Sequence, residues 1–336
     1  MTRLPPVPSL ADGAFRTGQT ARQTALDASR IARLRDHSRY ISVTMEFRCN
    51  LRCTHCMIEG TMDRLPPTSE AEFAKILRDQ AERRPWDGLI LTGSEITLRR
   101  DLGDLVRRAR AAGFSHIRIQ THGMQLSRPG YLDGLIAAGV DEFFISVAGS
   151  DAESHDRITQ VPGSWDRMMR GIEQIEAHGG DLVVITNTVV TAQSYRLLSG
   201  MVQALARFSC VAQHEFWNYF PMAERDEKQL IVRHADLIPP LRAAIAAAQA
   251  AGRRVEVKNV PQCLLGEDGD TLVNAQPTLV ISPDFWVEFD RNGFYRCPHQ
   301  DRCASQECLG LTEAYIHRFG DERDQLKIVV QPPDPT

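Results

Sequence analysis

The 336-residue chain lacks features that would place it in a membrane, outside the cell or on nucleic acid. It has no run of about 18 apolar residues, so we expect no transmembrane helix. Residues 1–8 lack a charged segment followed by an apolar core, which argues against a secretory signal. The net charge is −4 and the pI about 6.2, so no overall basic field attracts nucleic acid. We therefore expect a cytoplasmic protein without a membrane or nucleic-acid partner.

Internal repeats are absent as well, which leaves an ordinary globular composition. Hydrophobic residues make up 43% of the chain and charged residues 24%. The length allows one large barrel-type domain with a small appendage, or two ordinary domains. Residues 1–39, Arg-rich between 16 and 35, are expected to form a helical extension that leads into the first strand. Residues 331–336 (QPPDPT) are expected to be a disordered tail.

Short apolar segments rich in β-branched residues recur between residues 40 and 220 and predict parallel strands buried on both faces. The six segments are Ile41–Met45, Gly88–Thr92, His116–Thr121, Glu142–Val147, the apolar part of Asp181–Val190, and Gln213–Tyr219. Val255–Val260 is a candidate for one more strand. Helical patterns lie between them: one begins at a capping box of Ser69 and Glu72, and others cover Asp101–Ala112, Ser164–Ala177 and Leu237–Ala251.

Alternating strands and helices build a parallel barrel or a doubly wound sheet. Because six strands are too few for a closed eight-stranded barrel, we predict an α/β fold with a partial parallel (β/α)6 TIM-like barrel over residues 40–252. Residues 253–330 are rich in loops and contain four cysteines. A loop-rich segment of this length needs another source of order, so we predict a C-terminal cysteine domain organised by a metal site.

Eight cysteines in a chain without a secretory signal are expected to be reduced rather than paired in disulfides. Clustered cysteines then indicate metal binding or redox chemistry. They fall at positions 49, 53 and 56, at 263, and at 297, 303 and 308, which suggests two metal sites. Cys210 stands alone in an apolar stretch and is expected to be an inert core thiol.

Residues 46–60, EFRCNLRCTHCMIEG, directly follow the first predicted strand, at the edge where parallel barrels place their chemistry. Cys49, Cys53 and Cys56 have the spacing C-x3-C-x2-C on this one loop. Four thiolates complete a tetrahedral zinc site or an iron–sulfur cubane, whereas three leave one iron of a cubane open to another ligand. A zinc site completed by His55 or by a distant residue is the alternative.

The C-x3-C-x2-C spacing after a first barrel strand resembles the signature of the radical S-adenosylmethionine (SAM) superfamily, and the resemblance extends over about residues 40–220. It implies a 4Fe-4S cluster on Cys49, Cys53 and Cys56, whose open iron chelates the amino and carboxylate groups of SAM. It also implies that one-electron reduction cleaves SAM to methionine and a 5′-deoxyadenosyl radical, which abstracts hydrogen from a substrate. The implied partner is an external electron donor of the flavodoxin or ferredoxin type.

The end of the second predicted strand, TGSE at residues 92–95, resembles the Gly-Gly-Glu-Pro segment that lines the amino group of SAM in this family. If Glu95 aligns directly, Gly93, Ser94 and Glu95 take that role. If Ser94 is an insertion, Thr92 and Gly93 take the place of the two glycines. The proline is absent here, and an ordinary strand–helix turn with a helix N-cap is the alternative.

Three later strand ends carry further resemblances. Thr121–Gly123 (THG) resembles Thr-Asn-Gly and receives no firm role. Ser146, before AGSDAESHDRITQVPGSW, resembles a strand-end serine that contacts the ribose or carboxylate of SAM. Asn187 on the fifth strand is another candidate for cofactor contact, although a buried Asn is more often satisfied within the protein. Residues 214–220 (HEFWNYF) are expected to line the adenine or the substrate, unless these aromatic residues belong to the core.

Cys263, Cys297, Cys303 and Cys308 supply four thiolates, enough for a closed cubane. The arrangement loosely resembles the auxiliary-cluster domains, of the twitch or SPASM type, of many radical SAM enzymes. It implies a second 4Fe-4S cluster that transfers electrons, binds substrate or is purely structural. Structural zinc, with or without His299 as a ligand, is the rival interpretation.

The substrate is the least defined part of the prediction. Residues 1–39 are too short for the winged-helix domain with which many peptide-modifying relatives bind a leader peptide, which favours a small-molecule substrate. A sugar, nucleoside or amino-acid derivative in a biosynthetic pathway is expected. A radical SAM maturase that modifies a peptide or protein is the second hypothesis. A zinc-stabilised, non-catalytic binding protein is the alternative from another class, and it would ignore SAM.

Overall fold

The computed structural model describes residue 34, residues 36–58, residue 60 and residues 64–330. Most of the expected N-terminal extension and the expected tail at 331–336 lie outside these residues. Just before the first strand, His37–Arg39 form a short 3-10 helix (η2). The Asp36 side chain caps it by accepting a hydrogen bond from Ser38 N at 2.9 Å.

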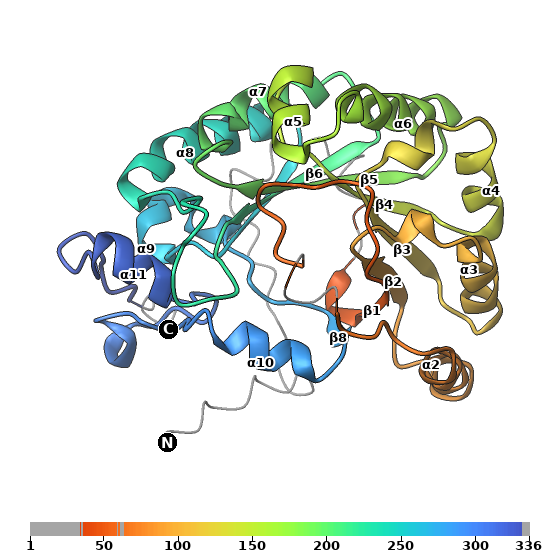
Figure 1. Cartoon of the computed structure of the whole chain (residues 1–336), viewed down its shortest axis with the longest axis horizontal. Coiled ribbons are helices and arrows are strands. Elements are labelled where there is room, and N and C mark those ends of the chain that lie inside the picture. Colours follow the sequence, from red (N-terminus) through yellow and green to blue (C-terminus); the bar gives the residue numbers. More distant parts are fainter. Residues whose placement is uncertain (1–33, 35, 59, 61–63, 331–336) are drawn as a thin grey trace, which may run out of the picture.

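One eight-stranded sheet organises the described residues, in the order β7-β6-β5-β4-β3-β2-β1-β8 (Figure 1). Every neighbouring pair is parallel. Its open edges confirm the predicted α/β partial barrel, and its first six strands are those expected from the sequence. The strands are β1 (Tyr40–Glu46), β2 (Gly88–Gly93), β3 (His116–Thr121), β4 (Glu142–Ser146), β5 (Val183–Val190), β6 (Val211–Asn218), β7 (Arg254–Lys258) and β8 (Thr278–Val280).

The sheet is wider than the predicted six strands, because residues after 252 add a strand at each edge. The candidate seventh strand is confirmed as β7, which pairs with β6. β8 carries no sequence signal, since its three residues follow Pro277 in a loop-rich stretch. It pairs with β1 at the other edge, where Ile41 lies opposite Thr278. The cysteine-rich C-terminal segment is therefore joined to the barrel through both edges of one sheet.

Helices surround the outer side of the curved sheet (Figure 1). None in the described part of the chain combines the length and apolarity needed to cross a bilayer. The α-helices are α2 (Glu70–Arg83), α3 (Leu102–Ala111), α4 (Tyr131–Ala138), α5 (Ala152–Thr159), α6 (Ser164–His178), α7 (Leu198–Leu205), α8 (His234–Ala250), α9 (Gln262–Leu265), α10 (Asp284–Asp290) and α11 (Glu313–Phe319). Short 3-10 helices are η3 (Ile96–Leu98), η4 (Met124–Ser127), η5 (Tyr195–Leu197), η6 (Gly266–Thr271) and η7 (Gln300–Arg302).

The helix signals are largely confirmed, with one shifted boundary. The Ser69 side chain accepts from Glu72 N, and the Glu72 side chain accepts from Ser69 N, so the capping box of α2 is complete. α8 begins at His234, three residues before the expected start. The reason is tertiary: the His234 ring stacks on Tyr315 with centroids 4.1 Å apart, and His234 N donates to the Tyr315 hydroxyl at 2.8 Å.

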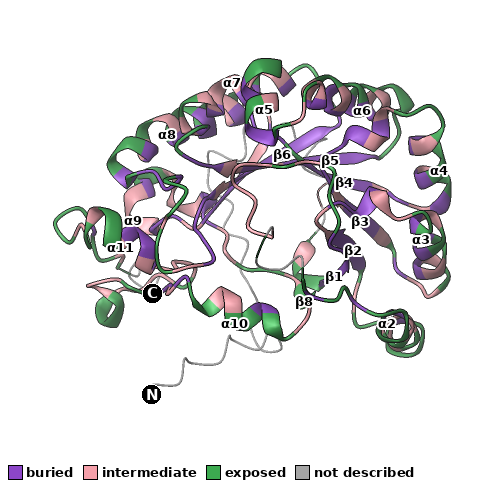
Figure 2. Ribbon diagram, in the orientation of Figure 1, coloured by how far each residue is buried: buried purple, intermediate pink, exposed green. Residues whose placement is uncertain are grey.

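The main core lies between the sheet and the outer helices, and the strands are buried along this layer (Figure 2). Alternate strand residues such as Val43, Ile119 and Phe216 pack there against helix residues such as Leu105 and Leu241. The residues between them face the inner side of the sheet and are frequently polar. Cys210 is 6% exposed and belongs to the outer core, where burial raises the pKa of its thiol, as expected for an inert cysteine.

Three charged or polar side chains close the amino end of the barrel. Arg118 on β3 donates to the carboxylate of Glu142 on β4, and His37 Nε2 lies 3.2 Å from Glu142 Oε2. Burial raises the pKa of Glu142, but Arg118 and His37 outweigh it and lower the pKa to about 2. The inner side of the barrel therefore ends in an ion pair at its base.

Replacing Glu142 by Gln should lower the free energy of unfolding near neutral pH by roughly 3 kcal/mol, because Arg118 is left buried without its counter-charge. The folded-state pKa of Glu142 is below its ordinary 4.5, so its contribution is present above about pH 4.5 and is lost as the pH falls toward 2. Urea unfolding at a series of pH values measures this, and Glu142→Gln should flatten the acid limb. The control Glu153→Gln removes an exposed carboxylate and should leave the limb unchanged. Identical acid limbs for wild type and Glu142→Gln would contradict the assignment.

Candidate cofactor and metal sites

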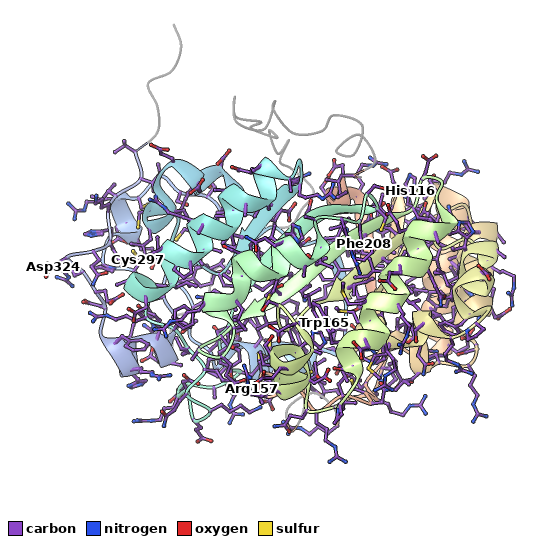
Figure 3. All side chains as sticks on the ribbon, turned by 90° about the horizontal axis from the view of Figure 1, so that it is seen from above. His116, Arg157, Trp165, Phe208, Cys297 and Asp324 are labelled. Carbon is purple, nitrogen blue, oxygen red and sulfur yellow. The ribbon has the colours of Figure 1, made fainter. Side chains whose placement is uncertain are left out.

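The first cysteine loop, residues 47–58, leaves β1 at the carboxyl edge of the sheet and runs across its inner side past α5 (Figure 1). Figure 3 shows the two edges: His116, the first residue of β3, lies toward one, and Arg157 on α5 lies at the opposite one. Cys49, Cys53 and Cys56 thus lie on the edge where parallel barrels bind ligands.

The middle of the first cysteine loop is tied to the end of α5 by main-chain hydrogen bonds. Arg52 N donates to Thr159 O at 3.0 Å, and Thr54 N donates to Ile158 O at 2.9 Å. These carbonyls belong to the last turn of α5 and have no partner within the helix itself. The loop therefore satisfies the helix end, and the helix end fixes the backbone between Cys49 and Cys56.

The segment that resembles the family pattern after Ser146 sets the position of α5. The His155 Nδ1 accepts from Ala148 N at 3.2 Å and so holds the turn between β4 and α5. The Asp156 carboxylate accepts from Gly163 N at 2.6 Å and from Trp165 N at 2.9 Å, at the start of α6. These two residues act on the cysteine loop only through the helix that they position.

The three thiols of the first cysteine loop are free of disulfides. Cys49 is exposed as a residue, but burial of its thiol raises the pKa of that thiol. The Leu51 N–H, 3.4 Å from the sulfur, lowers the pKa and partly offsets this effect. The nearby Glu95 and Cys56 raise the pKa further. The Cys56 thiol is therefore close enough to Cys49 to raise the pKa of Cys49. Thiolates gathered in this way fit a cationic iron–sulfur centre, which binds the deprotonated form.

Gly93 at the end of β2 has no room for a side chain. Its φ is +149°, and an added Cβ would lie 1.8 Å from the carbonyl oxygen of Glu46, the last residue of β1. Ser94 N also donates to that carbonyl at 2.7 Å. The glycine therefore permits a close approach, as expected, but the partner seen here is the backbone from which the cysteine loop departs.

Glu95 is fully buried and joins the ends of β2 and β3. Its Oε1 accepts from Thr97 N at 3.0 Å and from the Thr121 hydroxyl at 2.7 Å, and its Oε2 accepts from His122 N at 2.8 Å. The bond to Thr97 N caps η3, so the expected alternative of a capped turn is present in the structure. A role of Glu95 toward the amino group of SAM stays a prediction.

His122 extends this network to the cysteine loop. Its Nδ1 accepts from Met124 N at 3.2 Å, so the proton of the neutral ring lies on Nε2. Nε2 is 2.7 Å from Asn50 Oδ1 and 3.0 Å from Glu95 Oε2. Burial lowers the pKa of His122 more than Glu95 raises it, which favours the neutral ring. Asn50, next to Cys49, is thereby held by the ends of β2 and β3.

The remaining predicted cofactor contacts offer polar atoms that other described residues leave without a hydrogen bond. The Ser94 hydroxyl and Asn187 Oδ1 are buried and have no partner in the described chain. Ser146, the last residue of β4, is exposed and lies opposite Asn187 in the register of β4 and β5. Buried polar atoms without partners are uncommon, so these positions suit contact with a bound molecule.

The second cysteine group brings together residues far apart in the sequence. Burial raises the pKa of the Cys263 thiol, and a hydrogen bond from the Lys327 backbone offsets part of this increase. The nearby Cys308, Cys297 and Cys303 raise the pKa of Cys263 further. All four thiols are free. Main-chain N–H groups of His299 and Gly310 lie 3.5 Å and 3.3 Å from the sulfurs of Cys297 and Cys308. Hydrogen bonds to sulfur are typical of iron–sulfur sites.

The spacing of donors bears on the zinc alternative. No three His, Cys, Asp or Glu side chains of the described residues are arranged to hold a single metal ion. Thiolates on one tetrahedral zinc lie about 3.8 Å apart, given Zn–S bonds of about 2.3 Å. In an iron–sulfur cluster each thiolate binds a different iron, so the sulfurs lie further apart. The kind of metal centre at either cysteine group stays a prediction.

The family model of the radical SAM superfamily matches residues 43–196, which include the first cysteine loop, Glu95, Ser146 and Asn187. Residues 43–196 belong to the radical SAM superfamily. This radical SAM chain is 34% identical over 166 residues to a probable GTP 3′,8-cyclase of Methanopyrus kandleri, covering 49% of the chain and 52% of that protein. It is 30% identical over 168 residues to an AdoMet-dependent heme synthase of Nitratidesulfovibrio vulgaris, with coverages of 50% and 45%. The chain spans about half the length of these curated relatives.

Solved structures of other proteins share the fold of this radical SAM chain. Streptococcus suis SuiB bound to the precursor peptide SuiA superposes with a TM-score of 0.53 at 17% identity, covering 68% of this chain and 52% of that chain. Native anSMEcpe with bound AdoMet superposes with a TM-score of 0.52 at 14% identity, with coverages of 65% and 63%. At these identities the likeness concerns the fold alone.

Two parts of the radical SAM site escaped the sequence-based prediction. Asn50 and His122 received no role, although THG at the end of β3 marked the position of His122. The pairing of Arg52 and Thr54 with the end of α5 left no signal, because main-chain bonds do not depend on residue type. The proximity of Cys263 to the other three cysteines of the second group agrees with the sequence-based grouping.

Replacing Gly93 by Ala should destabilise the protein and reduce the iron content of the first cysteine loop, because the new methyl group collides with the Glu46 carbonyl. The matched control is Gly134→Ala in α4, where the added Cβ meets nothing within 4 Å and should be neutral or stabilising by about 1 kcal/mol. Thermal unfolding and iron analysis of both variants measure the difference. Equal melting temperatures and equal iron contents of the two variants would show that the close approach of Gly93 to the Glu46 carbonyl is not required for the fold or for iron binding.

Proposed function

We propose that the chain is an enzyme that binds a 4Fe-4S cluster through Cys49, Cys53 and Cys56 and uses it with SAM for radical chemistry. The observation that carries this proposal is the first cysteine loop, in which three cysteines that form no disulfide are held at the carboxyl end of β1. Membership of the radical SAM superfamily supports it.

The cluster and SAM, when bound, supply a 5′-deoxyadenosyl radical that abstracts hydrogen from the substrate. The role of the protein chain itself is to bind and orient the cluster and SAM. The hydrogen bonds of Arg52 and Thr54 to the end of α5 and the Asn50–His122–Glu95 network fix the backbone that carries the three cysteines. Ser146 and Asn187 offer polar atoms on the inner face, beside the end of β4, where we place the sugar or carboxylate of SAM.

A small molecule is the proposed substrate, and a flavodoxin or ferredoxin is the proposed electron donor. Two curated relatives, a probable GTP 3′,8-cyclase and a heme synthase, are named for small-molecule chemistry, which supports this choice. A peptide substrate is the second candidate; SuiB, solved with its precursor peptide, shares the fold of this chain at 17% identity.

The second cysteine group is proposed to hold another 4Fe-4S cluster. Cys263, Cys297, Cys303 and Cys308 would ligate all four irons of such a cluster, which leaves no open iron for substrate and favours electron transfer or a structural role. The N–H groups near Cys297 and Cys308 support thiolate ligation, because they stabilise negative sulfur.

Anaerobically reconstituted protein should contain roughly eight irons and eight sulfides per chain, because two four-iron clusters form. The triple variant Cys49→Ala/Cys53→Ala/Cys56→Ala should retain about half of them, and the control Cys210→Ala should retain all, since Cys210 belongs to the core. Iron and sulfide analysis with ultraviolet–visible spectra measures these contents. Zinc in place of iron after anaerobic preparation would support the binding-protein alternative instead.

Reduced wild-type protein should release 5′-deoxyadenosine from SAM, and the triple variant should not, because it lacks the open iron. Chromatography of quenched reactions, with dithionite or reduced flavodoxin as donor, measures the product. The variant Cys263→Ala should still bind SAM, since that cysteine belongs to the second group. Absence of 5′-deoxyadenosine from iron-replete wild type under reduction would overturn the proposed function.

A further inference from the structure

A patch of charged and polar side chains lies on the inner faces of β6 and β7, away from the cysteines. We call it the inner-wall patch; its members are Gln213, Glu215, Trp217, Glu256 and Lys258. Glu215, Glu256 and Lys258 are 4%, 7% and 4% exposed. Their neighbours along the strands, such as Phe216 and Val257, pack in the outer core, so the patch faces the inner side.

Hydrogen bonds fix the geometry of the inner-wall patch. Gln213 Nε2 donates to Glu215 Oε1, and Trp217 Nε1 donates to Glu215 Oε2, both at 2.9 Å. Lys258 Nζ donates to Glu256 Oε2 at 3.2 Å and to Val273 O at 2.6 Å. Lys258 Nζ also lies 5.3 Å from the centre of the Trp217 ring. The indole is thus held at its nitrogen and over one face.

Glu215 keeps hydrogen-bond acceptor positions that the other members of the patch do not fill. Glu256 pairs with Lys258 and also with Arg254, whose Nη2 is 2.9 Å from Glu256 Oε1. Glu215 receives two neutral N–H donors, and Lys258 is 3.9 Å away. A carboxylate has about four acceptor positions, so Glu215 can accept further hydrogen bonds. Buried charges are seldom retained for stability alone, which points to a binding role.

Two amide oxygens beside Glu215 need hydrogen-bond donors. Because Gln213 gives its Nε2 to Glu215, the orientation of its amide is fixed, and Gln213 Oε1 is left buried without a partner among the described residues. Asn187 lies opposite Glu215 in the register of β5 and β6, and its Oδ1 has no partner in the described chain either. Ser146, Asn187, Glu215 and Glu256 form one continuous row across β4 to β7.

We propose that the inner-wall patch is the substrate-recognition site of this enzyme and takes a planar nitrogen heterocycle with adjacent N–H donors on one edge. The carboxylate of Glu215 and the oxygen of Gln213 accept from that edge, as acidic and amide side chains do with nucleobase edges. The half-buried indole of Trp217 stacks on the face of the ring. The inference rests on the proposed function, since the row from Ser146 places the heterocycle beside SAM.

Guanosine and pterin, which carry such an edge, serve as probes, and adenosine, which lacks it, is the comparison. Equilibrium dialysis against iron-replete protein with SAM present should show saturable binding of guanosine or pterin in the millimolar range or below, and weaker binding of adenosine. Trp217→Leu should weaken this binding roughly tenfold or more, while SAM affinity and iron content stay unchanged. The control Trp286→Leu, on α10 and 40% exposed, should behave as wild type.

A second variant guards against misfolding of the first. Glu215→Gln keeps the shape of the side chain and should abolish the preference for guanosine or pterin over adenosine. Parallel loss of SAM affinity in Trp217→Leu would assign the indole to the cofactor and overturn the inference. Absence of saturable binding of both probes by wild type that contains iron and releases 5′-deoxyadenosine would also overturn it, while leaving the proposed function intact. Loss of iron or of 5′-deoxyadenosine release in wild type would instead count against the proposed function.

Discussion

The geometry of the first cysteine loop depends on two main-chain hydrogen bonds, from Arg52 and Thr54 to the last carbonyls of α5. The loop has no regular secondary structure of its own, so its backbone must find partners elsewhere. The end of α5 needs donors for the same reason. Each element supplies what the other lacks, and His155 and Asp156 make the arrangement rigid by fixing α5 between β4 and α6.

The two faces of the sheet have different roles: the outer face stabilises the fold, and the inner face carries the polar groups of the candidate site. The outer face is apolar and packs against helices, which stabilises the barrel. The inner face and the strand ends beside it carry the polar groups of Glu95, Asn187, Glu215 and Lys258, and burial of such groups opposes stability unless each finds a partner. Glu95 finds its partners within the protein, at the ends of β2 and β3, whereas Asn187 does not. Glu95 therefore organises the candidate site, whereas Asn187 Oδ1 is available to a ligand.

The sequence-based prediction succeeds where the pattern is local and repeated. Strand periodicity located β1 to β6, and the Ser69–Glu72 pair located the start of α2, because each depends on neighbours along the chain. It failed where tertiary contacts decide: His234 joins α8 through Tyr315, and β8 forms only because β1 offers an edge. At the candidate site the cysteines were found by spacing, but the bond of His122 to Asn50 links separate strands and could not be read from either segment alone.

The pairing of β1 with β8 has a consequence for the order of assembly. Ile41 lies near the start of the described chain and Thr278 near its end, so the strand that supports the first cysteine loop keeps an unpaired edge until the C-terminal segment has been synthesised. The segment that closes this edge also carries Cys297, Cys303 and Cys308. The strand that supports the first cysteine group is therefore completed only by the segment that carries most of the second group.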